Sequence, residues 1–281
     1  MPAASPWSAS DDPAGSPVPP GTLRSVPGQP EQQAPPAQRL RVRYAKRSRM
    51  RFTSHRDFSR AFERAVVRAG VPMAYSSGFH PHPRISYAGA APTGAASEAE
   101  YLELGLARVT DPAQVLAALD GSLPPGLDVL EVVEATGASL ADRLEASAWR
   151  TRVPDLGDED ARRAVSAFLA ADEVPVERMT KKGMRRFDCR AAVVSLAARA
   201  AGPLPAPGVG SGASGQECAI LEMVLRHGTP TVRPDDVLAG LLRIAGLDAT
   251  AAPIHERVAQ GPLDMGTGTV GDPLALNRDT A

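Results

Sequence analysis

The stretch RLRVRYAK, residues 39–46, alternates basic and apolar side chains over its first six residues. Alternation with a period of two is typical of a β-strand that has one face in the core. We therefore expect Leu40, Val42 and Tyr44 to point inward. The opposite face of this strand would carry three basic side chains, Arg39, Arg41 and Arg43.

The next segment, TSHRDFSRAFERAVVRAG (residues 53–70), predicts a helix. Ser54 lies three residues before Asp57, as in a capping box, and Gly70 is placed to end the helix. The apolar residues recur at helical spacing and would face the core. They are Phe58, Phe62, Ala65, Val66 and Ala69.

Four further segments complete a first domain. RISYA (84–88) and EYLELGL (100–106) predict strands, DPAQVLAALDGSL (111–123) predicts a helix, and LDVLEVVEA (127–135) predicts a strand. The order strand, helix, strand, strand, helix, strand is that of a ferredoxin-like domain. Such a domain has two helices on one face of an antiparallel sheet.

The second half has a similar order of elements, although its sequence identity to the first half is negligible. Its expected elements are a strand at 148–155, a helix at 157–171, a hairpin within 174–198, a strand at 218–228 and a helix at 233–246. The hairpin would turn at Lys182 and Gly183. The fold class that we predict is α+β, with tandem ferredoxin-like domains and disordered N- and C-terminal tails.

Composition places the domain boundaries. Residues 1–38 contain ten of the 27 prolines and almost no aliphatic side chains, so we expect a disordered leader. The first domain would span 39–137. The second domain would span 145–258 and include a flexible loop rich in Gly, Pro and Ser at 200–217. Residues 259–281 would form a disordered tail.

The chain has 281 residues, of which 43% are hydrophobic, and two cysteines. The first residues have neither a basic segment nor an apolar core, so they do not resemble a signal peptide. No apolar run reaches the roughly 20 residues of a membrane span. Two isolated thiols suit a reduced protein, so we expect a cytoplasmic location, no contact with a membrane and no cofactor in this chain.

Positive charge is concentrated in residues 39–87, which hold twelve Lys or Arg against two Asp or Glu, although the net charge of the chain is -1. Within the predicted helix, arginines recur every four residues and form one stripe. A second basic segment, 177–190, has six Lys or Arg against two acidic residues. Ordinary solvated faces usually mix both signs, so these surfaces favour a polyanion such as RNA.

The residues that we expect to contact RNA are therefore basic side chains from both segments. They are Arg41, Arg43, Arg47, Arg49, Arg51, Arg60, Arg64, Arg68, Arg84, Lys181, Lys182, Arg185 and Arg186, and Arg56 belongs to the same helical stripe. Aromatic residues lie between them in the first segment, and ferredoxin-like sheets commonly stack RNA bases.

The segment GFHPHPR, residues 78–84, contains two histidines that are each followed by a proline. A metal site would need further ligands, and the prolines already make this loop rigid. We therefore expect a loop that shapes a substrate site, and no metal. The substrate-shaping residues would be Ser54, His55, Asp57, Gly78, Phe79, His80 and His82. The alternative is general-base catalysis of RNA cleavage by His55 or His82, with Asp57 nearby.

These motifs resemble one known family. The Ser54, His55 and Asp57 motif, the pair Glu63-Arg64, GFHPHPR, and Glu98 with Glu100 are together similar to the radical SAM-linked (radical SAM-associated) protein family, a bacterial domain of unknown function. The resemblance is close over about 40–135 and weaker at 180–183 and in the 233–238 segment. The family tends to have asparagine at position 80, and an amide is a poor metal ligand.

The resemblance implies a partner, because these domains occur fused to, or encoded beside, a radical SAM enzyme. This chain lacks the three closely spaced cysteines that hold a SAM-cleaving cluster, since Cys189 and Cys218 are 29 residues apart. We therefore expect a non-catalytic accessory protein that presents tRNA or rRNA to a separate radical SAM enzyme. The alternative is a metal-independent RNA endonuclease that uses His55 or His82.

Overall fold

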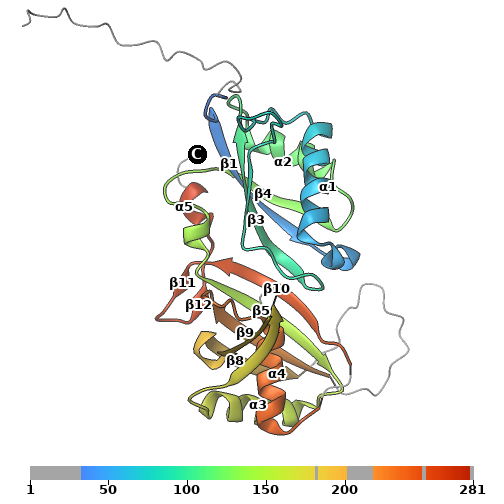
Figure 1. Cartoon of the computed structure of the whole chain (residues 1–281), viewed down its shortest axis with the longest axis vertical. Coiled ribbons are helices and arrows are strands. Elements are labelled where there is room, and N and C mark those ends of the chain that lie inside the picture. Colours follow the sequence, from blue (N-terminus) through green and yellow to red (C-terminus); the bar gives the residue numbers. More distant parts are fainter. Residues whose placement is uncertain (1–32, 181–182, 201–217, 249–250, 279–281) are drawn as a thin grey trace, which may run out of the picture.

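The computed structural model describes residues 33–180, 183–200, 218–248 and 251–278, and these form a mixed α+β protein (Figure 1). The elements of the first half are β1 (Gln38–Lys46), the 3-10 turn η1 (Ser48–Phe52), α1 (His55–Arg68), β2 (Ile85–Ala88), β3 (Ala96–Leu106), α2 (Pro112–Asp120) and β4 (Leu127–Glu134). The leader and the loop that we expected at 1–38 and 200–217 lie almost wholly outside the described residues.

The remaining elements are again strands mixed with helices. They are η2 (Ala141–Arg143), β5 (Ala146–Pro154), α3 (Asp158–Ala170), β6 (Pro175–Thr180), β7 (Gly183–Asp188), η3 (Arg190–Ala192), β8 (Val193–Ala200), β9 (Cys218–Arg226), α4 (Pro234–Ala245), β10 (Ile254–Gly261), β11 (Leu263–Asp264), β12 (Thr269–Val270) and α5 (Ala275–Arg278). No described helix is long and apolar enough to cross a membrane.

One eight-stranded sheet joins both halves, in the order β4-β1-β3-β10-β5-β9-β8, with β2 also paired to β3. The strands of each half pair in antiparallel fashion. The halves meet where β10 runs parallel to the first residues of β3, with Glu256 opposite Ala96 and Arg257 opposite Ser97. The two halves therefore share a continuous backbone hydrogen-bond network.

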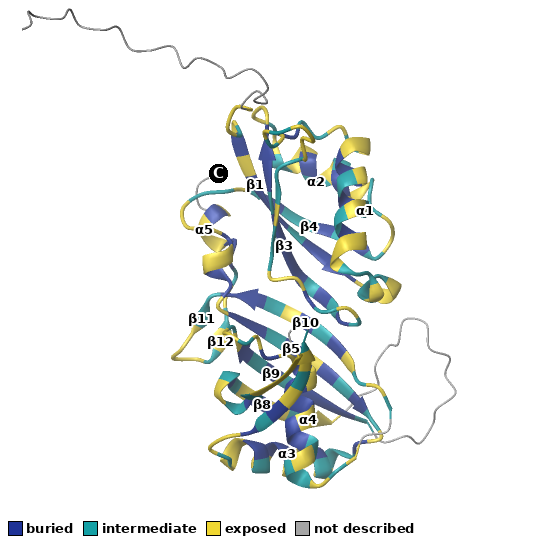
Figure 2. Ribbon diagram, viewed as in Figure 1, coloured by how far each residue is buried: buried dark blue, intermediate teal, exposed yellow. Residues whose placement is uncertain are grey.

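The core of the first half lies between its sheet and the helices α1 and α2 (Figure 2). Leu40 and Val42 of β1 are fully buried there, as the alternation predicts, and they meet Phe58 and Phe62 of α1. The Ser54 hydroxyl accepts a hydrogen bond from the Asp57 amide at 3.2 Å. The predicted helix and its N-terminal cap are confirmed.

The core of the second half lies between its strands and the helices α3 and α4. Trp149 of β5 packs with Phe168 of α3 and with Leu241 of α4. The hairpin β6–β7 forms a separate two-stranded sheet beside α4. The strand β10, which closes this half, is an element that the sequence analysis did not predict.

The expected disordered tail at 259–281 is wrong up to Arg278. Residues 259–261 complete β10 and pair with β5, β12 lies beside β5 and β10, and α5 packs on β4 of the first half. The Asn277 side chain accepts hydrogen bonds from Arg41 at 2.9 Å and from Arg143 at 2.7 Å. Its amide group donates to the carbonyl of Glu134 at 2.7 Å. The segment is therefore held by polar contacts to buried arginines and also by Leu274, which is fully buried in a cluster with Tyr101 and Leu144.

Candidate nucleic-acid interface

The exposed side of α1 carries the arginine stripe. Its buried side is fixed by Phe58, Phe62 and Val66, so the residues between them must face solvent. Within the described residues, no carboxylate lies within ion-pairing distance of Arg56, Arg60 or Arg64. The three guanidinium groups are therefore free to contact an external anion. Arg68, at the end of the stripe, donates to the Ser122 carbonyl at 3.1 Å.

A hollow of about 430 Å³ lies beside this stripe and opens widely to solvent. The α1 side of the hollow is formed by Arg60, Glu63, Arg64 and Val67, and Tyr75 and Pro83 form the other side. Tyr75 is 40% exposed. Two arginines against one glutamate leave this wall with a net positive charge, and guanidinium groups opposite an exposed aromatic ring can bind a phosphate and stack a base.

The loop after Tyr75 is held by main-chain contacts. The Ser76 amide donates to the His82 carbonyl at 2.9 Å, and the His82 amide donates to the Ser76 hydroxyl at 3.0 Å. Gly78 has φ of 129°, a conformation that side chains with a Cβ rarely adopt. Phe79 at the tip of the loop is 78% exposed. The loop between the lining residues Tyr75 and Pro83 thus presents an exposed aromatic ring.

The histidines that we considered as catalytic bases lie on separate elements. His55, at the first turn of α1, contacts Tyr87 edge to face at 5.0 Å and the Ser59 hydroxyl at 3.3 Å. Asp57 accepts a hydrogen bond from the Ser54 hydroxyl at 2.7 Å. In the described part of the chain, no hydrogen bond or ion pair joins His82 to His55 or Asp57.

Among the described residues, no three His, Cys, Asp or Glu side chains gather as metal ligands. We expect protein purified without chelators to contain less than about one tenth of an equivalent of zinc or iron, because a stable site needs three or four such ligands. Elemental analysis of the wild type and of His82→Ala measures this. One equivalent of metal that is lost in His82→Ala would contradict the expectation.

Several arginines that we predicted to contact RNA are used inside the protein instead. Arg41 is only 2% exposed, so its predicted contact with RNA is wrong. Arg43 donates to the Glu98 carbonyl at 3.0 Å. Arg47 pairs with Glu98 and with Asp128. The Arg43 and Arg47 side chains are therefore engaged with a carbonyl and with carboxylates of the protein itself. Arg41 lies under α5, whose Asn277 accepts its hydrogen bond.

Of the other arginines that we predicted to contact RNA, some are exposed and others are half-buried. Arg49 is exposed on η1, whereas Arg51 is half-buried with its guanidinium over the Phe52 ring. Arg84 is half-buried and donates to the Tyr75 carbonyl at 3.0 Å. Arg185 and Arg186 are exposed on β7. The other two predicted residues of the second basic segment, Lys181 and Lys182, lie outside the described residues.

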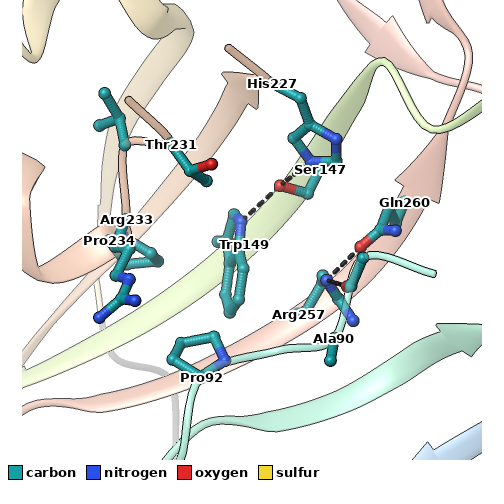
Figure 3. A pocket seen from close by; sticks show the side chains of 12 residues that line it. Ala90, Pro92, Ser147, Trp149, His227, Thr231, Arg233, Pro234, Arg257 and Gln260 are labelled. Carbon is teal, nitrogen blue, oxygen red and sulfur yellow. Dashed lines mark hydrogen bonds between the residues drawn. The ribbon is translucent and has the colours of Figure 1, made fainter. Parts of the chain in front are cut away.

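A second pocket, of about 330 Å³, lies where the two halves meet (Figure 3). The Ser147 hydroxyl and the His227 Nε2 are 3.1 Å apart, and the His227 Nδ1 is 2.7 Å from the Leu144 carbonyl oxygen. A carbonyl oxygen only accepts, so Nδ1 carries the proton and Ser147 donates to Nε2. The Trp149 indole in turn donates to the Ser147 oxygen at 2.8 Å.

This pocket was not predicted from the sequence. Trp149 lies in the strand predicted at 148–155, but Ser147 precedes that range and His227 follows β9, 80 residues from Ser147. His255 likewise has partners distant in the sequence, since it lies 2.8 Å from Asp235 and 2.9 Å from the Thr151 hydroxyl.

Burial lowers the pKa of His227 below its ordinary value near 6.5. The folded state thus favours the neutral ring, and its stabilising effect is full above pH 6.5 and lost as the pH falls toward the lowered pKa. We expect the melting temperature of the wild type to fall over this range more steeply than that of His227→Gln. Equal slopes in thermal melts across pH 5–7 would contradict this role.

Three buried charged side chains lie next to the same pocket. Arg257 and Glu100 form an ion pair in which each side chain is only 3% exposed. Lys46 is 4% exposed, and its amino group lies 3.4 and 3.5 Å from the carbonyl oxygens of Ala91 and Pro92. Burial lowers the pKa of Lys46. The cluster therefore contains two basic side chains and one carboxylate.

The fold and the surface together define a mixed α+β protein with a free basic helix face, a neighbouring aromatic hollow and a pocket between two halves. The chain belongs to a bacterial family described as "Uncharacterized protein conserved in bacteria (DUF2344)", whose model matches residues 39–234. This match includes α1, the loop 78–84 and most of the second half. A comparison with curated proteins finds no match.

Proposed function

We propose that this protein binds RNA, such as tRNA or rRNA, and presents it to a separate radical SAM enzyme without catalysing a reaction itself. The observation that carries the RNA proposal is the hollow of about 430 Å³ between the unpaired arginines Arg60 and Arg64 and the exposed ring of Tyr75. Guanidinium groups suit phosphates, and an exposed ring suits an unstacked base.

The binding surface that we propose is formed by α1, by η1 and by the loop between α1 and β2, and it does not include the faces of the sheet. Exposed side chains of three kinds supply it: the stripe Arg56, Arg60 and Arg64, the η1 residue Arg49, and the aromatic rings of Phe52, Tyr75 and Phe79. A single strand that follows the stripe would meet Tyr75 and then Phe79. Positioning of this kind contributes to a partner's reaction by orienting the substrate.

We also infer that each half is a ferredoxin-like unit. The first half has the strand order β4-β1-β3-β2, and the second half has the order β10-β5-β9-β8. Both orders place the first and third strands of the half in the centre and the last strand at one side. In the second half the hairpin β6–β7 would be an insertion.

The proposal of a radical SAM partner rests on the sequence resemblance. Burial raises the pKa of the Cys189 thiol to about 12, which disfavours the thiolate that binds iron. Cys218 is the other thiol, and it lies on β9. An accessory role in RNA modification would place the protein in the cytoplasm.

We expect deletion of this protein to erase the same RNA modification as deletion of the neighbouring radical SAM enzyme, because the enzyme would lose its presented substrate. Mass spectrometry of nucleosides from the two deletion strains measures this. A modification that persists in the first strain and is absent from the second would contradict the accessory role.

The RNA can be identified by crosslinking in cells, followed by sequencing of the bound RNA and identification of co-purified proteins. Purified protein is expected not to cleave that RNA. Specific cleavage that is lost in His55→Ala would instead support an endonuclease.

A further inference from the structure

The pocket between the two halves has the features of a ligand site. Its volume, about 330 Å³, is at the lower end of the range for small-molecule pockets. Its walls come from the loop after β2, from β5, from β10 and from the residues before α4 (Figure 3). We propose that this pocket binds one nucleoside monophosphate unit, either free or as part of a bound RNA. The second source rests on the proposed function.

The charges around the pocket favour an anion. Arg257 lines it, and Lys46 is buried against the carbonyl of the lining residue Pro92, while Glu100 is the one carboxylate in their cluster. Arg233, also in the lining, is exposed and has no carboxylate within ion-pairing distance in the described residues. A phosphate would balance the excess of positive charge.

Two carboxylates at the start of α4 lie close enough to Arg233 to interact with it electrostatically. Their hydrogen bonds go to other groups, since Asp235 is hydrogen-bonded to His255 at 2.8 Å and Asp236 pairs with Arg178 at 2.5 Å. The guanidinium donors of Arg233 therefore remain for a ligand.

The uncharged lining suits a nucleobase. Trp149 presents an indole, and Pro92 and Pro234 add flat apolar surface. Gln260 is fully buried, and its Nε2 has no hydrogen-bond partner among the described residues although its Oε1 accepts from Arg257. An unpaired buried amide costs free energy, and a carbonyl or ring nitrogen of a base would satisfy it.

The pocket also lies between the two basic elements. The loop that lines it is tied to η1, because the Gly94 amide donates to the Arg51 carbonyl at 2.7 Å. On the other side, Arg178 of the hairpin β6–β7 donates to the carbonyl of the lining residue Thr231 at 3.0 Å. An RNA strand that contacts η1 and the hairpin would pass the pocket.

Trp149 reports directly on ligand binding. The chain has two tryptophans, so Trp7→Phe leaves Trp149 as the single indole. In this background we expect at least one of AMP, GMP, CMP and UMP to change the Trp149 fluorescence in a saturable manner. Ribose 5-phosphate and the matching nucleoside should bind at least about tenfold more weakly, because each lacks one of the two recognised groups.

Two exposed positions provide variants that leave the core intact. Ala90→Phe fills the pocket from the loop, and Arg233→Ala removes the free guanidinium. Each should weaken nucleotide binding at least about tenfold while thermal melts stay unchanged. Absence of a fluorescence change with all four nucleotides and with a single-stranded RNA overturns the proposal. A change that persists unaltered in Ala90→Phe also overturns it.

The two sources of the nucleotide are separated by the α1 stripe. If the source is RNA, a single-stranded RNA changes the Trp149 signal, and Arg60→Glu with Arg64→Glu abolishes that response while free nucleotides still bind. If free nucleotides bind and RNA does not, the pocket proposal stands with a free nucleotide as ligand and the proposed function fails. If RNA binds without changing the Trp149 fluorescence, with equal affinity in the wild type and in Ala90→Phe, and no free nucleotide changes that fluorescence, the pocket proposal is overturned and the proposed function stands.

Discussion

Glu100→Leu is expected to lower the free energy of unfolding by about 3–5 kcal/mol, because it leaves a buried arginine without its anion. The Glu100 and Arg257 side chains are each 3% exposed, and Glu100 also accepts from the Ala91 amide at 3.2 Å. Lys46, buried beside them, would lose the same neighbouring carboxylate. Denaturant unfolding followed by circular dichroism gives the difference in unfolding free energy.

The matched control is an exposed ion pair on α3. Arg162→Ala removes the pair with Asp158, which is closed at 2.6 Å by side chains that are 60% and 32% exposed. Pairs of this kind contribute about 0.3–0.5 kcal/mol, so the control should unfold close to the wild type. If Glu100→Leu also unfolds within about 1 kcal/mol of the wild type, the ion pair between Glu100 of β3 and Arg257 of β10 does not stabilise the junction of the two halves.

Reversing three arginines of the α1 stripe is expected to reduce RNA affinity at least about 100-fold, which is about 2.7 kcal/mol. The triple variant is Arg56→Glu, Arg60→Glu and Arg64→Glu. Each change removes a guanidinium group that forms no ion pair within the described residues, and adds a carboxylate that the RNA phosphates repel. The helix itself should survive, because one row of like charges replaces another. Arg47 is excluded, since its pairs with Glu98 and Asp128 belong to the fold.

The control must carry the same change in net charge. Three exposed arginines elsewhere serve this purpose: Arg108→Glu, Arg163→Glu and Arg199→Glu. RNA affinity should fall far less in this variant than in the stripe variant, as measured by fluorescence anisotropy. An equal loss in both variants would mean that only the overall charge matters and that no defined surface exists.

The local elements of the fold could be predicted from the sequence because their causes are local. Leu40 and Val42 alternate with arginines. Asp111, followed by Pro112, starts α2, and its side chain accepts a hydrogen bond from the Ala113 amide at 2.9 Å. The arginine stripe of α1 followed from helical spacing alone. Each of these features depends on residues only a few positions apart.

The features that could not be predicted depend on distant partners. The burial of Arg41 follows from Asn277, which is 236 residues away. The tail has many Gly and Pro residues, so its composition gave no sign that Leu274 is fully buried. The pocket exists because β10 pairs with both β3 and β5, and no local pattern indicates this.

The salt dependence of RNA binding tests the central claim, that the α1 stripe is an RNA-binding surface. For single-stranded RNA, the logarithm of the association constant should fall with the logarithm of salt concentration by about 0.7 per phosphate contacted. We expect the slope of the stripe variant to be shallower than that of the wild type by about 2, because three contacts are lost. A wild-type slope near zero, or identical slopes and affinities in the two proteins, would contradict the claim.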